Sequence, residues 1–160
     1  MKKQYKHLSE GLKPIFNSNS SILILGSFPS VKSREGNSYY GHPQNRFWGV
    51  MEKLYNTNIS DKEEFLLSHQ IALWDVVESC DIIGSSDSSI KNVKINDILR
   101  IINSSNINKI YTNGKVAHRL FNKYLSQYTD LEDICLPSTS PANAVYNFDK
   151  LIDCWQIIKE

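Results

Sequence analysis

The sequence is poor in the residues that build covalent or metal-held scaffolds. It has three cysteines in 160 residues, Cys80, Cys135 and Cys154, with no CxxC pair and no Cys/His pair at metal-ligand spacing. A disulfide framework, a structural zinc site and an iron–sulfur cluster are therefore not expected. We expect reduced thiols, no metal and a cytoplasmic location.

Long apolar runs and a strong charge of one sign are also missing. No run approaches the roughly 20 apolar residues that a membrane-spanning helix needs, and the amino-terminal residues are too polar for a signal peptide. The formal net charge is +1, so a nucleic-acid partner would have to be bound by groups gathered on one face. We therefore expect no association with membranes.

The residues that are present describe a globular protein. With 41% hydrophobic and 22% charged residues, the chain can bury a core without covalent staples. It contains neither an internal repeat nor a long linker, so residues 1–160 are expected to form a single domain.

Short apolar runs alternate with helical patterns along the chain. Strands are expected over residues 22–25, 71–77, 107–113 and 133–137, and helices over residues 47–55, 61–69, 95–105, 114–125 and 148–160. This alternation predicts an α/β fold in three layers, α/β/α, around a mainly parallel four-stranded central sheet. Ligands of such sheets bind beyond the carboxyl ends of the strands, and the unusual motifs of this sequence fall at those ends.

The first motif, LGSFPS, directly follows the strand expected at residues 22–25. Gly26 and Pro29 favour a tight turn, and the small Ser27 leaves backbone N–H groups accessible to a ligand. An ordinary strand-to-loop turn explains these residues equally well. The GxxxxGK[ST] pattern of a phosphate-binding loop is missing.

The second motif, YYGHPQNRFW, precedes the helix expected at residues 47–55. The ring of Tyr40 can stack on a flat ligand, and the amide of Asn45 can orient a water or hydrogen-bond a base edge. Phe47 and Trp48 are better explained as anchors of the helix in the core. A packing cluster is therefore the alternative interpretation of the whole segment.

The third motif, LPSTSPANA, follows the strand expected at residues 133–137. Ser138, Thr139 and Ser140 offer hydroxyl and backbone donors in a row, which can bind a phosphate without a positive charge. A plain serine- and threonine-rich turn is the alternative.

The order of five blocks between residues 22 and 144 resembles the uracil-DNA glycosylase superfamily. The blocks are LGSFPS, YYGHPQNRFW, LWDVVESC, TNGKVA and LPSTSPANA. The resemblance is strongest to the hypoxanthine-DNA glycosylase branch, and HPQNRFW is also similar to mismatch-specific uracil/thymine DNA glycosylases. It implies a uracil-DNA glycosylase-like fold and a monofunctional enzyme without lyase activity. Such an enzyme hydrolyses the N-glycosidic bond of a deaminated base, here best matched to hypoxanthine, in base excision repair without a cofactor.

Three positions depart from other branches of this superfamily. Phe28 stands where the mismatch-specific branch has the asparagine that positions the attacking water, and Ser138 replaces the histidine of an HPSP motif. Asp75 replaces an asparagine, a change for which the sequence offers no explanation. In the hypoxanthine branch the catalytic residue is the asparagine of HPxNxFW, which corresponds to Asn45.

The resemblance implies roles for the remaining site residues. Those expected to bind the base are Gly26, Ser27, Phe28, Tyr40 and Asn113, and those expected to bind DNA are Ser138, Thr139, Ser140, Asn143 and Lys115. Lys115 is also the one candidate for a lyase nucleophile, but a phosphate contact at a helix start explains it better.

Two other functions remain open at this point. One is a glycosylase for uracil or for thymine mismatches, and the other is a non-catalytic module that binds damaged DNA, which Phe28 would favour. A small-molecule α/β enzyme ranks last, because no phosphate loop is present. The expected partner is double-stranded DNA with a deaminated base, with single-stranded DNA left open, and the protein is expected to be a monomer.

Overall fold

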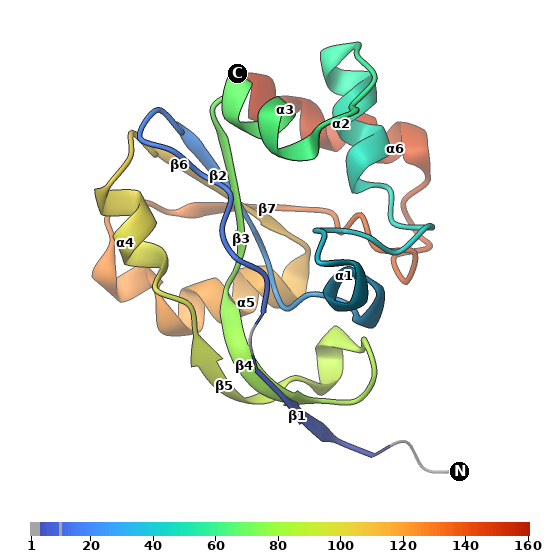
Figure 1. Ribbon diagram of the computed structural model, residues 1–160, viewed down its shortest axis with the longest axis vertical. Coiled ribbons are helices and arrows are strands. Elements are labelled where there is room, and N and C mark those ends of the chain that lie inside the picture. The colour runs from blue at the N-terminus through green and yellow to red at the C-terminus, as the bar shows by residue number, and fades with distance from the viewer. Residues whose placement is uncertain (1–3, 10) are drawn as a thin grey trace.

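The computed structural model describes residues 4–9 and 11–160, and a four-stranded parallel sheet lies at its centre (Figure 1). Its strands are β2 (Ile22–Gly26), β3 (Ile71–Asp75), β6 (Lys109–Asn113) and β7 (Asp133–Leu136). Their order is β3-β2-β6-β7, and every neighbouring pair is parallel. The predicted central sheet is therefore confirmed, although β3, β6 and β7 are shorter than the expected strands.

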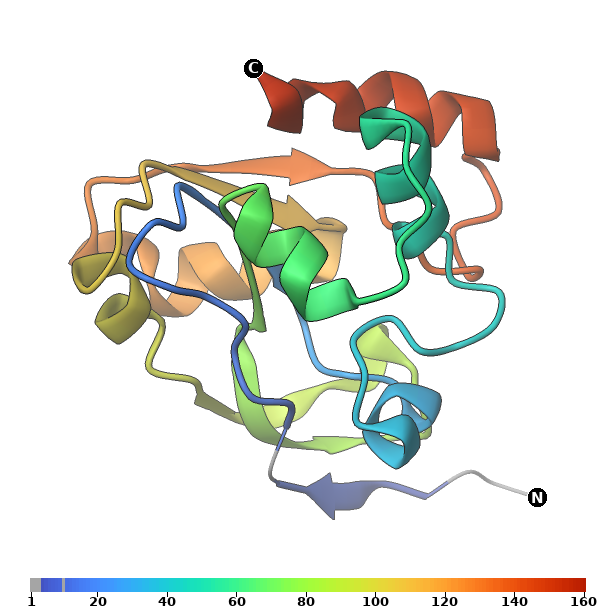
Figure 2. The same ribbon diagram turned by 45° about the horizontal axis from the view of Figure 1, so that its top comes forward.

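Six α-helices are found in the part of the chain that the structure describes. They are α1 (Val31–Gly36), α2 (Phe47–Tyr55), α3 (Lys62–Ser68), α4 (Ile98–Asn103), α5 (Lys115–Tyr124) and α6 (Phe148–Trp155). In Figures 1 and 2, α2, α3 and α6 lie on one side of the sheet, and α4 and α5 lie on the other. None of these helices is long and apolar enough to cross a bilayer.

The handedness of the connections explains this division of the helices. The path from β2 to β3 and the paths to β6 and β7 move across the sheet in opposite directions. Because crossovers between parallel strands are right-handed, α2 and α3 must cover one face, and α4 and α5 must cover the other. α6 follows the last strand, and it lies on the face of α2 because Trp155 packs edge-on against Phe47. Both faces of β2 and β3 are consequently buried along their whole length, which accounts for the continuous apolar run ILIL. The three-layer prediction is confirmed.

A second sheet was not expected from the sequence. It is antiparallel, in the order β1-β4-β5, and its strands are β1 (Lys6–Leu8), β4 (Val77–Ile82) and β5 (Lys91–Ile95). The strand expected over residues 71–77 is wrong at its end, because β3 stops at Asp75 and β4 begins two residues later. The antiparallel sheet thus extends the fold beyond the carboxyl end of β3 (Figure 1).

Candidate active site

The motifs singled out in the sequence meet at the carboxyl edge of the parallel sheet. β2 ends at Gly26 and β3 ends at Asp75, and these two residues are paired in the β2–β3 register. β6 ends at Asn113, which is paired with Leu136 at the end of β7. The loop of residues 138–143 follows β7 directly, so the first and third motifs share one edge, as the strand order predicts. The second motif follows no strand, and contacts of Asn45 with Thr139 and of Tyr40 with Gly26 bring it to the same edge.

Asn45 is held in one orientation immediately before α2. Its Oδ1 accepts hydrogen bonds from the backbone N–H of Phe47, at 2.9 Å, and from Oγ1 of Thr139, also at 2.9 Å. The Phe47 N–H can only donate, so the amide oxygen must face it. Both lone pairs of Oδ1 are occupied, and the partly exposed side chain can reach a substrate or a water only through its Nδ2 group.

Thr139 connects Asn45 to the end of β6. Its backbone N–H donates to Oδ1 of Asn113 at 3.0 Å, and its Oγ1 accepts from Nδ2 of Asn113 at 3.0 Å. Thr139 is fully buried, and its hydroxyl proton is directed at Asn45. The structure therefore places Thr139 inside the protein and not on the surface where a DNA phosphate was expected, and it uses the amide of Asn113 to position Thr139.

Arg46 fastens the loop after β7 to the start of α2. Its guanidinium donates to the backbone oxygens of Thr139 at 3.4 Å, Ser140 at 2.9 Å and Asn143 at 3.0 Å, and it also donates to that of Tyr146. Its backbone N–H donates to the same Thr139 oxygen at 3.1 Å. Sequence reasoning missed Arg46. The signal was a cation enclosed by aromatic residues, because such a group needs acceptors when it is partly buried.

We expect Arg46→Lys to lower the free energy of unfolding by roughly 1–3 kcal/mol and to weaken DNA binding. A lysine keeps the charge, but it cannot reach several carbonyl oxygens at once as the planar guanidinium does. Urea denaturation and binding to abasic-site DNA measure the two effects. Arg119→Lys, on the exposed side of α5, is the matched control. Equal free energies of unfolding for the two variants would show that the hydrogen bonds of the Arg46 guanidinium do not stabilise the fold.

The loop after β7 is ordered by its own side chains. Oγ of Ser138 accepts from the Ser140 N–H at 3.1 Å, and Oγ of Ser140 accepts from the Ala142 N–H at 3.2 Å. Nδ2 of Asn143 donates to the Ser138 backbone oxygen at 3.0 Å. The two serine hydroxyls therefore keep their protons free to donate to a phosphate, whereas one N–H of Asn143 is already used.

The turn between β6 and α5 lies directly against this loop. Gly114 has φ +100°, and a Cβ at this position would come within 3.0 Å of the Ser138 Cβ, so only glycine allows the close approach. Lys115 follows as the first residue of α5 and is exposed. Lys115, Ser138 and Ser140 thus lie near one another, as a phosphate-binding role requires, and that role remains a prediction.

Tyr40 presents one face of its ring to the core. It stacks on Phe47 with ring centres 4.2 Å apart and planes 27° apart, and Trp48 meets Phe47 edge-on at 4.9 Å. Phe47 is fully buried, so its predicted packing role is confirmed. Tyr40 itself adopts φ 53°, a region that is uncommon for a residue with a side chain. Stacking of a base on its other face stays a prediction.

Phe28 and Ser27 differ in what they contact. Phe28 is buried, with the Arg34 guanidinium carbon 5.7 Å from its ring centre, and a Cβ on Gly11 would lie 3.8 Å from the ring. Its side chain therefore contacts the amino-terminal segment and α1. Ser27 is buried near Asp87 of the 3₁₀ helix η1 (Asp87–Ser89), and its hydroxyl opposes the rise in the pKa of Asp87 that burial causes.

Asp75 is a buried carboxyl group at the end of β3. Burial raises its pKa from the ordinary value of 3.8 to about 7, and the charge of Asp87 adds to the rise. Its backbone oxygen accepts from Nδ2 of Asn96 at 2.8 Å, whereas its side-chain Oδ2 has no hydrogen-bond partner among the residues that the structure describes. The sequence marked this position as unusual, but it did not indicate burial.

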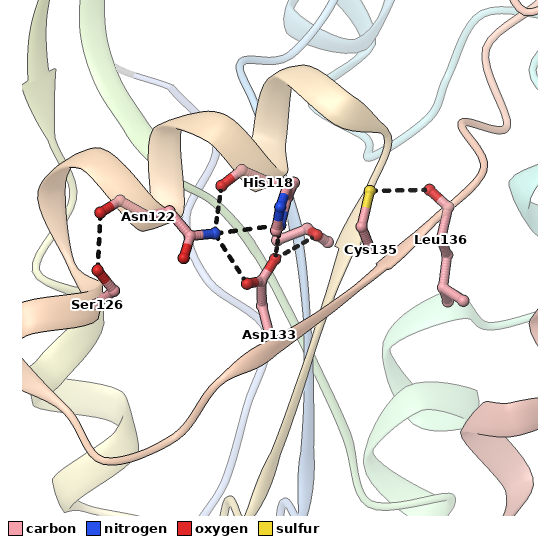
Figure 3. A network of polar contacts seen from close by, with 7 residues as sticks. His118, Asn122, Ser126, Asp133, Cys135 and Leu136 are labelled. Carbon is pink, nitrogen blue, oxygen red and sulfur yellow. Dashed lines mark hydrogen bonds and ion pairs between the residues drawn. The ribbon is translucent and has the colours of Figure 1, made fainter.

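A second polar cluster lies between α5 and β7 (Figure 3). Asp133 accepts hydrogen bonds from Thr112 Oγ1 at 2.7 Å and Asn122 Nδ2 at 3.0 Å, and its Oδ2 lies 2.6 Å from His118 Nδ1. A surface hollow of about 470 Å³ lies beside it, and another of about 430 Å³ lies beside Asn96. Because the Asp133 carboxylate is fully paired, this cluster is best explained as a tie between α5 and β7.

Comparison with known proteins agrees with the arrangement at the sheet edge. Residues 14–159 match the family described as the uracil DNA glycosylase superfamily. The chain belongs to this superfamily. The resemblance inferred from the five sequence blocks is therefore confirmed.

Relatives within the superfamily come from two methanogens. A hypoxanthine DNA glycosylase of Methanosarcina barkeri is 36% identical over 113 residues, which cover 66% of this chain and 71% of that protein. A hypoxanthine DNA glycosylase of Methanosarcina acetivorans is 33% identical over 142 residues, which cover 85% of this chain and 89% of that protein. The solution structure of a candidate uracil DNA glycosylase from M. acetivorans is 29% identical, with a TM-score of 0.78 over 95% of this chain and 99% of that one. The predicted uracil-DNA glycosylase-like fold is confirmed.

Proposed function

We propose that this protein is a monofunctional DNA glycosylase that removes hypoxanthine from DNA by hydrolysing the N-glycosidic bond. Membership of the superfamily supports the reaction, and the two relatives named as hypoxanthine DNA glycosylases support the base. The structural observation that carries the proposal is Asn45, which Phe47 and Thr139 hold at the sheet edge, while its Nδ2 group makes no hydrogen bond to any described residue.

The hydrogen bonds of Asn45 constrain the mechanism. A base within a duplex must be flipped out of the stack before its glycosidic bond can be reached. Oδ1 of Asn45 has no lone pair left to accept a proton, and an amide is in any case too weak a base to deprotonate water. Asn45 therefore holds the water by donating to its oxygen, which leaves a lone pair of the water directed at C1′. Cleavage of the C1′–N9 bond must then lead, and the base leaves with the bonding electrons. Water captures the resulting sugar cation and gives up a proton, which neutralises the departed base.

The serine loop and the start of α5 supply the proposed DNA contacts. The free hydroxyl protons of Ser138 and Ser140 and the exposed ammonium of Lys115 can meet consecutive phosphates. Val145, in the same loop, is 79% exposed, the most exposed of the large apolar side chains in the described residues. Apolar side chains of this kind insert where DNA is unstacked, so Val145 suits the gap left by the flipped base better than Asn143 does.

The proposed substrate is double-stranded DNA with a deaminated base. We expect the protein to act as a monomer in the cytoplasm, where thiols stay reduced. No residue role proposed for the reaction calls for a cofactor.

A panel of duplexes tests the choice of base. The duplexes contain hypoxanthine, uracil, xanthine or a G·T mismatch, and strand cleavage by alkali after a single turnover reports base release. We expect release from the hypoxanthine duplex to be the fastest. Faster release of uracil or thymine would show that the protein is a uracil/thymine-mismatch glycosylase instead. Binding to abasic-site DNA without release from any duplex would make it a damage-binding module.

A further inference from the structure

Two buried polar side chains, Tyr40 and Asp75, lie against Gly26, and each carries an unpaired atom. Oη of Tyr40 and Oδ2 of Asp75 are buried without hydrogen-bond partners among the described residues. A Cβ built on Gly26 would lie 3.2 Å from Oη of Tyr40 and would overlap Oδ1 of Asp75. An unpaired buried polar atom destabilises the folded protein, so two side chains that carry such atoms beside one glycine indicate a site that a ligand completes.

The chemistry of the two groups limits what the ligand can be. The tyrosine hydroxyl can donate a hydrogen bond, and an ionised carboxylate can only accept one. A matching ligand must therefore present an acceptor and an N–H donor side by side. The lactam edge of hypoxanthine, with O6 next to N1–H, has this pattern. Adenine has the reverse, an amino donor at position 6 next to an acceptor at N1.

We propose that Asp75 and Tyr40 read the lactam edge of the flipped base, with the Asp75 carboxylate accepting from N1–H and the Tyr40 hydroxyl donating to O6. This inference rests on the proposed glycosylase function and names two specificity residues for it. It takes the place of the stacking role expected for Tyr40, because a ring stacked on a base cannot also donate to O6 in the plane of that base. Negative charge grows on the base as the C1′–N9 bond breaks, so the hydrogen bond from Tyr40 strengthens in the transition state. Guanine shares this edge, and its exclusion must arise at position 2 of the ring.

The surroundings of Asp75 make this recognition depend on pH. The titratable groups that face the carboxyl are Asp87 from η1 and the hydroxyls of Tyr39 and Tyr40, and the pKa of each tyrosine is raised by burial first and by Asp75 next. Burial raises the pKa of Asp75 to about 7, so the accepting form is lost as the pH falls below neutrality. Excision of hypoxanthine is then expected to fall about tenfold per pH unit below this point.

A methyl group on N1 tests the contact directly. Single-turnover excision is compared for duplexes that carry hypoxanthine or 1-methylhypoxanthine opposite thymine. The wild type is expected to prefer hypoxanthine by about a hundredfold, because the methyl group removes the donor and meets the carboxylate. In Asp75→Ala the preference for hypoxanthine over 1-methylhypoxanthine is expected to fall by at least about tenfold, because the shorter side chain leaves room for the methyl group.

Asp75→Asn provides a second readout that does not depend on how well Asp75→Ala folds. It keeps the size of the side chain and one acceptor oxygen, but it cannot titrate. Its excision rate is expected to stay constant between about pH 5.5 and pH 8.5. The control Asp153→Asn, on the exposed side of α6, is expected to lose excision rate at acid pH as the wild type does.

The outcomes separate this inference from the function on which it rests. The role of Asp75 is overturned if Asp75→Ala keeps the wild-type preference for hypoxanthine over 1-methylhypoxanthine, or if the excision rate of Asp75→Asn still falls with falling pH. Base release by the wild type would uphold the glycosylase function in either case. Absence of base release by the wild type on every duplex overturns the proposed function and the inference together.

Discussion

Asn45→Ala is expected to excise hypoxanthine about a hundredfold more slowly than the wild type in single-turnover assays. Alanine cannot hold the water that captures the sugar cation, and no other described side chain is known to replace the Nδ2 donor. Binding to abasic-site DNA should change little, because Asn45 acts on the reacting atoms and not on the phosphates. The rate constant and the dissociation constant, measured on the same preparation, check both statements.

Two further variants sharpen this test. Gln44→Ala removes an exposed neighbour in the same segment and should retain the wild-type rate. Thr139→Val keeps the buried volume but removes the hydroxyl that orients Asn45, so its rate should fall by roughly tenfold. Excision by Asn45→Ala at the wild-type rate would show that the catalytic residue lies elsewhere.

Asp75→Asn is expected to raise the free energy of unfolding at neutral pH by roughly 2–4 kcal/mol. The pKa of Asp75 rises from 3.8 in an ordinary environment to about 7 in the folded protein, first because of burial and then because of Asp87. The folded state therefore binds the proton more tightly than the unfolded state does. The resulting stabilisation is complete below about pH 4, and it is lost progressively as the pH rises to about 7.

The pH dependence of the difference between variant and wild type is the decisive feature. Urea denaturation near pH 4 and near pH 8 should show that Asp75→Asn has a higher free energy of unfolding than the wild type at the higher pH only. Asp81, on β4, is the matched control, because hydrogen bonds from Asn92 and His7 lower its pKa, so that Asp81→Asn should lose stability at neutral pH. An equal gain for Asp75→Asn at both pH values would mean that Asp75 is not a buried titrating group.

The parallel sheet could be predicted from the sequence, whereas the antiparallel sheet could not. β2 and β3 are buried on both faces, and their apolar runs are continuous. β5 has the sequence KNVKI, with every residue exposed or only partly buried. Its pairing with β4 is irregular in register. Its two partly buried residues, Val93 and Ile95, alternate with polar ones, but two apolar positions are too few to predict a strand.

The location of the candidate site could be predicted, but its internal contacts could not. Parallel strands place their carboxyl ends at one edge, so motifs that follow the strands must come together there. The hydrogen bond from Thr139 to Asn45 joins residues 94 positions apart. Because the sequence does not show this distant contact, the residue types alone suggested a phosphate contact for Thr139. The burial of Thr139 and the hydrogen bonds of Arg46 depend on how the loop after β7 packs against α2.

The burial of Asp75 shows the same limit at a single residue. The resemblance marked Asp75 as a departure from the mismatch-specific branch, yet a carboxylate after an apolar run is compatible with an exposed strand end. Only the pairing of Gly26 with Asp75 and the approach of Tyr40 show that the carboxyl group lies over a glycine and lacks a partner. The raised pKa of Asp75 follows from that buried position.

Detection of the free base tests the central claim most directly. The purified protein in excess is mixed with a duplex that contains one hypoxanthine, and the released base is identified by mass spectrometry while the strand is followed on a gel. We expect free hypoxanthine and an abasic strand that remains intact until alkali is added. Absence of free base under these conditions, with the duplex still bound, would contradict the assignment of this protein as a hypoxanthine DNA glycosylase.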